Sequence, residues 1–286
     1  MLRNITLLAF FLAFFGFGET MAQKTIQTKQ GKPAKSTIAH KVGIIAHRGF
    51  YKYDGAAENS IASMQNAVDH DFFGTEFDVR ITGDNIAILY HNDNIQGLPI
   101  EELPLAELQL HPGFTLSNGE LIPTVKEFFN VYFKARSIQQ SARNTTTRLI
   151  YEIKPQRNPD KLATAIVTAY DMAKQYDLSK EIIFISFSID ACKMMHDRIP
   201  EASIGYLGGD IEPAELHDMG ISVLDYNFKV LLEHSEWVAK AHELGMTVIA
   251  WTVNDKQTVL DLTKLGVDYI TTDLPLDLNE WISNNR

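Results

Sequence analysis

The sequence predicts an α/β fold, a distorted (β/α)8 barrel of the TIM type, with an inserted segment between the second and third βα units. Short runs rich in Val, Ile, Tyr and Phe alternate with segments in which apolar residues recur at helical spacing. The β-rich runs number eight, which is the number of strands that a (β/α)8 barrel needs. Periodicity does not show that a sheet closes on itself, so a doubly wound open sheet is the alternative architecture.

The strands are expected where these short β-rich runs occur. They cover residues 41–47, 74–80, 148–154, 181–186, 202–207, 221–226, 246–251 and 267–273. Helices are expected between most of them, at residues 59–70, 159–176, 233–245 and 256–266, with a final helix at 276–285.

Two places break the alternation. Residues 87–91, AILYH, follow the second strand after a connection that is too short for a parallel crossover. They are expected to return as a hairpin or a distorted extra strand, which brings His91 back across from the start of TEFDV. Residues 92–148 are long and rich in Pro, Gly and Leu, and are expected to form an inserted subdomain or lid.

The formal net charge is -10, from 36 acidic and 26 basic residues. This balance argues against nucleic-acid binding, because no broad cationic surface is available to neutralise phosphates. It leaves room for a bound divalent cation, although a solvated acidic surface explains the charge equally well. The only cysteine, Cys192, has no intramolecular partner and is expected to be a small buried residue on a helix.

The first 22 residues predict a signal peptide, because one Arg precedes the apolar run ITLLAFFLAFFGFG and the small residue Ala22. We expect cleavage near Gln23, with an uncleaved anchor as the alternative. Residues 23–40 are polar and aperiodic, which predicts a flexible linker before a domain at 41–286. The protein is therefore expected to be exported, periplasmic or secreted, without stable membrane insertion after cleavage. Its oligomeric state is not indicated.

Carboxylates occur inside two apolar strands. Glu76 and Asp78 have the same strand parity and share a face, as do Glu152 and Lys154. Burying an unpaired charge costs several kcal/mol, so these groups should meet cations. Three carboxylates from two strands form a hard oxygen site that suits calcium or magnesium. The alternative is a layer of ion pairs inside the barrel, with Lys154, Arg48 or Arg80 as partners.

Two histidines and an arginine are expected near these carboxylates. His47 and Arg48 end the first strand, at the side of a barrel where active sites form. A lone histidine there is more often structural, but His91 supplies a second. Such a set can bind a metal, clamp a phosphate through the guanidinium and supply an acid and a base.

Several motifs occur in one order along the chain. They are AHRG, ENS, EFDV, TGDNIAILYHND, YEIK, IAWTVND and YITTDLP. In this order and spacing the chain resembles the glycerophosphodiester phosphodiesterase family, from about Val42 to Pro275. The resemblance implies metal-dependent hydrolysis of glycerophosphodiesters to sn-glycerol 3-phosphate and an alcohol. A related phosphodiesterase that acts on lipid head groups or wall polymers, and a non-catalytic phosphodiester-binding protein, are the alternatives.

The resemblance also implies a role for each matching residue. His47 and His91 match the family's acid/base pair, Arg48 its phosphate clamp and Lys154 its phosphate-side cation. Glu76, Asp78 and Glu152 match ligands of a divalent cation, Ca²⁺ or Mg²⁺. Trp251 matches a pocket-lining residue, Phe187 is a weaker candidate for the same wall, and Glu58 supports the site or lies close to the metal.

Two residues depart from the family pattern. Ala57 stands where members usually have Pro, which should affect only the stiffness of the loop. Asn92 stands beside His91 where members usually have Asp, with Asp93 one place later. Because a neutral amide orients a histidine without supporting its charge, we expect slowed or retuned catalysis. Asp225 and Asp273 end strands and could face the pocket, although Asp273 could equally cap the final helix.

Overall fold

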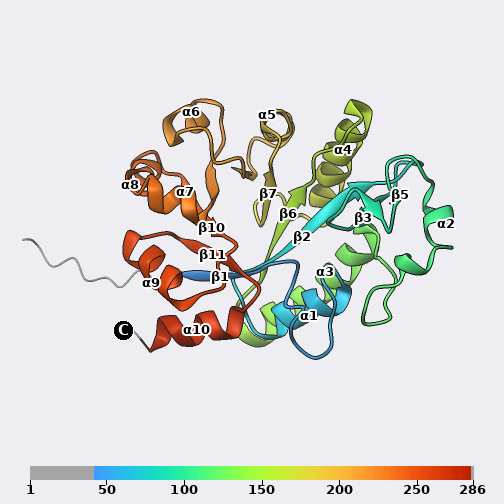
Figure 1. Cartoon of the computed structure of the whole chain (residues 1–286), viewed down its shortest axis with the longest axis horizontal. Coiled ribbons are helices and arrows are strands. Elements are labelled where there is room, and N and C mark those ends of the chain that lie inside the picture. Colours follow the sequence, from blue (N-terminus) through green and yellow to red (C-terminus); the bar gives the residue numbers. More distant parts are fainter. Residues whose placement is uncertain (1–41, 285–286) are drawn as a thin grey trace, which may run out of the picture. The chain divides into compact units, whose positions relative to one another are not determined.

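The structure, a computed structural model, describes residues 42–284, so the predicted signal peptide and linker lie outside the described residues. Its central feature is a barrel of eight parallel strands (Figure 1). The strands are β1 (Gly43–Ala46), β2 (Gly74–Ile81), β6 (Arg148–Ile153), β7 (Ile182–Ser186), β8 (Ser203–Tyr206), β9 (Val223–Asn227), β10 (Thr247–Trp251) and β11 (Tyr269–Thr272). Each pairs with its neighbour, and β1 pairs with both β11 and β2, which closes the sheet. The predicted barrel is therefore confirmed and the open sheet is wrong.

Helices surround the barrel. Those at the predicted places are α1 (Ile61–Asp69), α4 (Pro159–Gln175), α8 (Glu236–Glu243), α9 (Lys256–Leu265) and α10 (Pro275–Ser283). Cys192 is buried on α5 (Ile189–Arg198), and α6 (Pro213–Asp218) and α7 (Phe228–Glu233) complete the outer layer. Side-chain caps begin several of them, including Ser60 before α1 and Asp255 before α9. Among the residues described, no helix is long and apolar enough to cross a membrane.

The barrel interior is apolar below the level of the strands' carboxyl ends. Ile45, Ile150, Ile183, Val223 and Ile249 come from five strands and pack together there. Each fully buried side chain of this kind contributes about 1.5–3 kcal/mol relative to an exposed one. A larger apolar layer lies between the strands and the helices. This part of the barrel is thus a packed core, and a functional site can form only at the carboxyl ends of the strands.

The early return after the second strand is a hairpin, as predicted. β3 (Ala87–Leu89) pairs antiparallel with β2, with Val79 opposite Leu89. The backbone N–H of Tyr90 donates to the carbonyl of Asp78 at 3.0 Å, so His91 returns to the barrel mouth. The ammonium of Lys161 on α4 donates to the carbonyls of Thr82 and Gly83 and anchors the turn.

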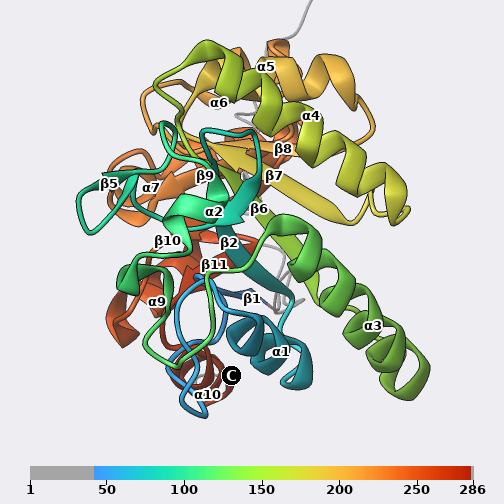
Figure 2. The same ribbon diagram turned by 90° about the vertical axis from the view of Figure 1, so that its right-hand side faces the viewer.

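The connection after β3 has two parts. Residues 94–114 contain the short strands β4 (Asn94–Ile95) and β5 (Leu98–Pro99), the helix α2 (Leu105–Leu108) and the 3₁₀ turn η1 (Pro112–Phe114). They pack around a small apolar cluster of their own. The helix α3 (Val125–Arg143) instead contacts α1 and packs on the barrel (Figure 2). Phe128 of α3 lies 4.5 Å from Phe77 between ring centroids. Residues 92–148 therefore contain two parts, a small separate cluster and the helix α3, which lies in the crossover from β2 to β6.

Candidate active site

Polar side chains replace the apolar core at the mouth of the barrel. Along β6 and just beyond it, Ile150, Glu152 and Lys154 have the same strand parity, so the interior changes from apolar to charged within two steps. A cavity of about 160 Å³ lies at this level. The predicted residues that line it are His47, Arg48, Glu76, His91, Glu152, Lys154, Phe187 and Trp251. Asp78 is buried beside it, and Glu58 lines an adjoining groove.

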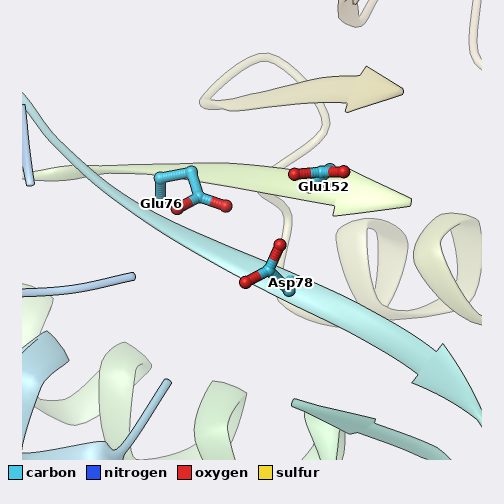
Figure 3. Close-up of side chains that lie close together, drawn as sticks. All are labelled: Glu76, Asp78 and Glu152. Atoms are coloured by element: carbon cyan, nitrogen blue, oxygen red, sulfur yellow. The ribbon is translucent and has the colours of Figure 1, made fainter. Parts of the chain in front are cut away.

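Three carboxylates meet beside this cavity. Asp78 of β2 is in register with Glu152 of β6, and Glu76 lies two residues earlier on β2 (Figure 3). One oxygen of each lies within 4.8 Å of the others. Burial, followed by the charges of the neighbouring carboxylates, raises the pKa of Glu76 well above its usual range, and that of Glu152 to about 7. These groups are therefore more crowded with negative charge than a buried site tolerates without cations.

The cations present balance part of this charge. Lys154 Nζ lies 2.8 Å from Glu152 Oε1 and 3.2 Å from Asp78 Oδ1. Arg48 Nε lies 3.5 Å from Asp78 Oδ2, and its Nη1 is 2.6 Å from Glu58 Oε2. The buried Glu76 Oε1 has no hydrogen-bond partner within residues 42–284. Hard oxygen donors with an unsatisfied buried oxygen fit a divalent cation, so the set can hold a metal in addition to its ion pairs.

Arg80 has a different use from the one considered in the sequence. Its guanidinium donates to the carbonyl of His91 at 3.0 and 3.2 Å and to that of Pro155 at 2.7 Å. It therefore ties the end of the hairpin to the end of β6. Arg80 holds the backbone of a site residue and makes no ion pair with the three carboxylates.

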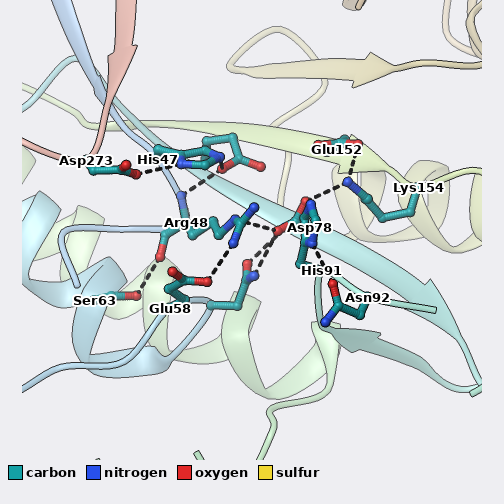
Figure 4. Close-up of polar contacts among 12 residues, drawn as sticks. His47, Arg48, Glu58, Ser63, Asp78, His91, Asn92, Glu152, Lys154 and Asp273 are labelled. Atoms are coloured by element: carbon teal, nitrogen blue, oxygen red, sulfur yellow. Dashed lines mark hydrogen bonds and ion pairs between the residues drawn. The ribbon is translucent and has the colours of Figure 1, made fainter. Parts of the chain in front are cut away.

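His47 is held by a carboxylate. Its Nδ1 lies 2.7 Å from Asp273 Oδ1, while Nε2 lies 4.0 Å from Glu76 Oε2 (Figure 4). Asn254 Nδ2 donates to the other Asp273 oxygen at 2.7 Å. Burial acts to raise the pKa of Asp273, but the hydrogen bond and charge of His47 outweigh it and, with Asn254, lower this pKa to about 2. Asp273 thus orients His47 and does not cap α10, whose N-cap is Leu274.

His91 is held by an amide. Its Nδ1 lies 2.9 Å from Asn92 Oδ1, and Asn92 is exposed. Burial is the main cause of a lowered pKa at His91. Asp93 does not replace the missing carboxylate, because it forms an ion pair with Arg157. The two histidines therefore face one cavity with different supports.

The loop after β1 uses unusual backbone conformations. Arg48 has φ 53° and Gly49 has φ 77°. A Cβ on Gly49 would lie 2.2 Å from Ser63 Oγ, so only glycine fits this close approach. The turn directs the Arg48 N–H to Glu76 Oε2 at 2.7 Å. Asn59, ten residues after Gly49 and also at positive φ, exchanges two hydrogen bonds with Asp78, at 2.9 and 3.0 Å.

Aromatic side chains form one wall of the cavity. Trp251 and Phe187 meet edge to face with centroids 5.5 Å apart. Trp251 Nε1 donates to the backbone carbonyl of Asp225 at 3.0 Å, which fixes the indole. Asn59 and Asn254 are parts of the candidate site whose contacts the sequence pattern did not indicate, since each acts through a contact made only in the folded chain.

Comparisons with known proteins identify the family of this chain. Residues 47–276 match the model of the glycerophosphoryl diester phosphodiesterase family. A glycerophosphodiester phosphodiesterase from Caldanaerobacter subterraneus is 27% identical over 248 residues, which cover 82% of this chain and 95% of the relative.

Two solved structures are also similar. A glycerophosphodiester phosphodiesterase from Parabacteroides distasonis superposes with a TM-score of 0.79 at 36% identity, over 85% of this chain and 98% of the other. A phosphodiesterase from Oleispira antarctica, solved with the product sn-glycerol 3-phosphate, has a TM-score of 0.68 at 25% identity, over 84% and 96%.

Proposed function

Because this chain belongs to the glycerophosphoryl diester phosphodiesterase family and is an enzyme that hydrolyses glycerophosphodiesters, we propose that its barrel mouth uses His47 and His91 as the acid/base pair, beside a divalent cation. The observation that carries the proposal is the pairing of these two separately supported imidazoles with three carboxylates on one cavity. The products are sn-glycerol 3-phosphate and an alcohol. The Oleispira antarctica structure supports the first of these, since it holds that product.

Glu76, Asp78 and Glu152 would hold the cation, Ca²⁺ or Mg²⁺. When bound, such a cation supplies charge neutralisation at the phosphate oxygens and acidifies a bound hydroxyl. Arg48 and Lys154 line the same cavity and offer donors to the remaining phosphate oxygens. Their present carboxylate partners keep both side chains in place before the substrate arrives.

The histidines move the protons. One imidazole takes the proton of the glycerol 2-hydroxyl as that oxygen bonds to phosphorus, and the other protonates the leaving alkoxide as its bond to phosphorus breaks. This step gives a cyclic phosphate and the free alcohol. A water molecule then opens the ring with the proton roles reversed, which yields sn-glycerol 3-phosphate.

Two open grooves adjoin the cavity at His91. One, of about 340 Å³, is lined by Tyr51, Glu58 and Tyr90, and the other, of about 630 Å³, by Gln156 and other polar residues. Both have a larger volume than the central cavity, which supports leaving alcohols of different sizes. The apolar run in the first 22 residues supports the further proposal that the enzyme is exported to the periplasm or secreted.

The proposed function is tested by release of sn-glycerol 3-phosphate from glycerophosphocholine, followed by a coupled dehydrogenase. We expect turnover by the purified chain, loss of turnover after chelation, and recovery when Ca²⁺ or Mg²⁺ is added. Glu152→Ala should lose activity, whereas the exposed Glu243→Ala is the matched control and should keep it. Full turnover in metal-free buffer contradicts the proposed need for a cation. The absence of turnover with any glycerophosphodiester contradicts the proposed function.

A further inference from the structure

One buried carboxyl in the cavity has no part in the chemistry described above. Asp225 lies in the middle of β9, is 1% exposed and lines the cavity. Its strand neighbour Leu224 belongs to the outer apolar layer, and Val223 belongs to the interior core. By strand parity, therefore, Asp225 points inward, one step above the packed core of the barrel.

The Asp225 carboxyl is not satisfied by the protein. Oδ1 has no hydrogen-bond partner among the described residues. Burying a carboxyl without a partner costs several kcal/mol, and native proteins keep such groups only where something else requires them. Burial and the charge of Glu152 raise its pKa well above the usual range, which reflects the same isolation.

The candidate metal site does not explain Asp225. Glu76, Asp78 and Glu152 form the group of carboxylates within 4.8 Å of one another, and Asp225 is not among them. Ile185 and Leu207 are among the residues that line the same cavity, and no described side chain makes a hydrogen bond to Asp225 Oδ1. The missing partner must therefore enter through the cavity.

The backbone of Gly205 on β8 packs close to Asp225. A Cβ on Gly205 would lie 3.4 Å from the Cβ of Asp225 and 3.1 Å from Ile185 Cγ2. The backbone carbonyl of Asp225 is held by Trp251 Nε1 at 3.0 Å. Its main chain is thus fixed between β8 and β10, and the unpaired oxygen is held ready for a ligand.

The substrate has one polar group left for this position. In the proposed mechanism its phosphate meets Arg48 and Lys154, its 2-hydroxyl meets an imidazole, and its leaving alcohol occupies one of the larger grooves at His91. Only the terminal CH₂OH of the glycerol remains, and this small group suits the narrow inner cavity. Trp251 and Phe187 form an apolar wall against which the glycerol carbons can pack.

We propose that Asp225 is a specificity-determining residue that hydrogen-bonds the glycerol hydroxyl farthest from the phosphate. This inference rests on the proposed function and adds to it the part of the substrate that is selected. Asp225 thereby distinguishes glycerol esters from diesters of alcohols that carry only the vicinal hydroxyl.

The test compares two substrates that share the same leaving group. Glycerophosphocholine carries the terminal hydroxyl, and 2-hydroxypropyl phosphocholine lacks it but keeps the vicinal one. The wild-type enzyme should prefer the first in kcat/KM by roughly 10- to 100-fold, because the second substrate leaves the buried carboxyl without a hydrogen-bond partner. Asp225→Leu should reduce this preference to within about threefold, and Asp225→Asn should keep most of it.

Thermal unfolding separates this role from a structural one. Replacing an unpaired buried carboxyl with an apolar side chain should leave the Tm of Asp225→Leu unchanged or higher. The control Asp255→Ala removes the cap of α9, so it should lower the Tm and keep the wild-type preference. Asp225→Val is a second apolar variant if the leucine does not fit.

The outcomes are distinguishable. A wild-type enzyme that hydrolyses neither substrate contradicts the proposed function itself. A wild-type enzyme that hydrolyses both equally, or an Asp225→Leu variant that keeps the full preference, overturns only the role of Asp225. An equal loss of kcat/KM for both substrates together with a lower Tm assigns Asp225 to the structure of the barrel and also overturns the inference.

Discussion

The two histidines of the candidate active site have the same ring and face the same cavity, but different parts of the chain support them. His47 follows a strand of the closed barrel, and its Nδ1 meets the carboxylate of Asp273, which Asn254 holds in turn. His91 follows the added hairpin, and its Nδ1 meets the exposed amide of Asn92. The protein thus orients both rings and gives a charged partner to only one.

The difference shows that the position of each histidine and the charge beside its ring are supplied by different contacts. The backbone of His91 is fixed by Arg80 and by the hydrogen bond from Tyr90 to Asp78, so its place does not depend on Asn92. The backbone of His47 is fixed by a hydrogen bond to Thr272, next to Asp273. The absence of a carboxylate beside His91 therefore leaves the geometry of the site intact, and it should affect the protonation of the His91 ring.

The largest effects should come from removing either ring. We expect His47→Ala and His91→Ala each to lower kcat/KM for glycerophosphocholine by about 10²- to 10⁴-fold, the usual contribution of general acid–base catalysis. Circular dichroism should show an unchanged fold. His217→Ala, at an exposed position on helix α6, is the matched control and should retain activity. Near-normal turnover in either site variant would remove that histidine from the mechanism.

Smaller effects should separate the two supports. Asp273→Asn removes a charge-assisted hydrogen bond worth about 1.5–3 kcal/mol, which corresponds to roughly 10- to 100-fold in kcat/KM. Asn92→Ala removes a neutral hydrogen bond worth about 0.5–1.5 kcal/mol, or roughly 2- to 10-fold. The comparison fails if the Asn92 variant loses as much activity as the Asp273 variant under the same assay.

Much of this site follows from short-range rules. Strand parity alone places Glu76 with Asp78 and Glu152 with Lys154, and parallel strands bring their carboxyl ends to one mouth. The family motifs then connect residues that lie far apart in the chain. The barrel, its strands and most of the charged residues that line the cavity could be predicted for this reason.

The remaining features depend on long-range contacts. His47 and Asp273 are separated by 226 positions, and no local pattern indicates that Asp273 binds a histidine and does not cap a helix. Asp93 likewise finds Arg157 in the folded chain. The division of residues 92–148 between a small cluster and α3 depends on which apolar faces meet, which composition does not reveal.

The smallest expected effect is a shift along the pH axis, and it tests the charge difference between the two histidines directly. Asn92→Asp places a carboxylate against His91 Nδ1, which favours the protonated ring and should raise the lowered pKa of His91. The limb of the kcat/KM profile that reports His91 should therefore move to higher pH. If His91 acts as a base in its neutral form, the acid limb moves. If it acts as an acid in its protonated form, the alkaline limb moves.

Asn92→Ala provides a control of opposite sign, because losing the amide acceptor disfavours the protonated ring and should move the same limb to lower pH. Profiles that coincide for all three enzymes would show that Asn92 has no influence on the protonation of His91, and the contrast with Asp273 would then be one of geometry alone.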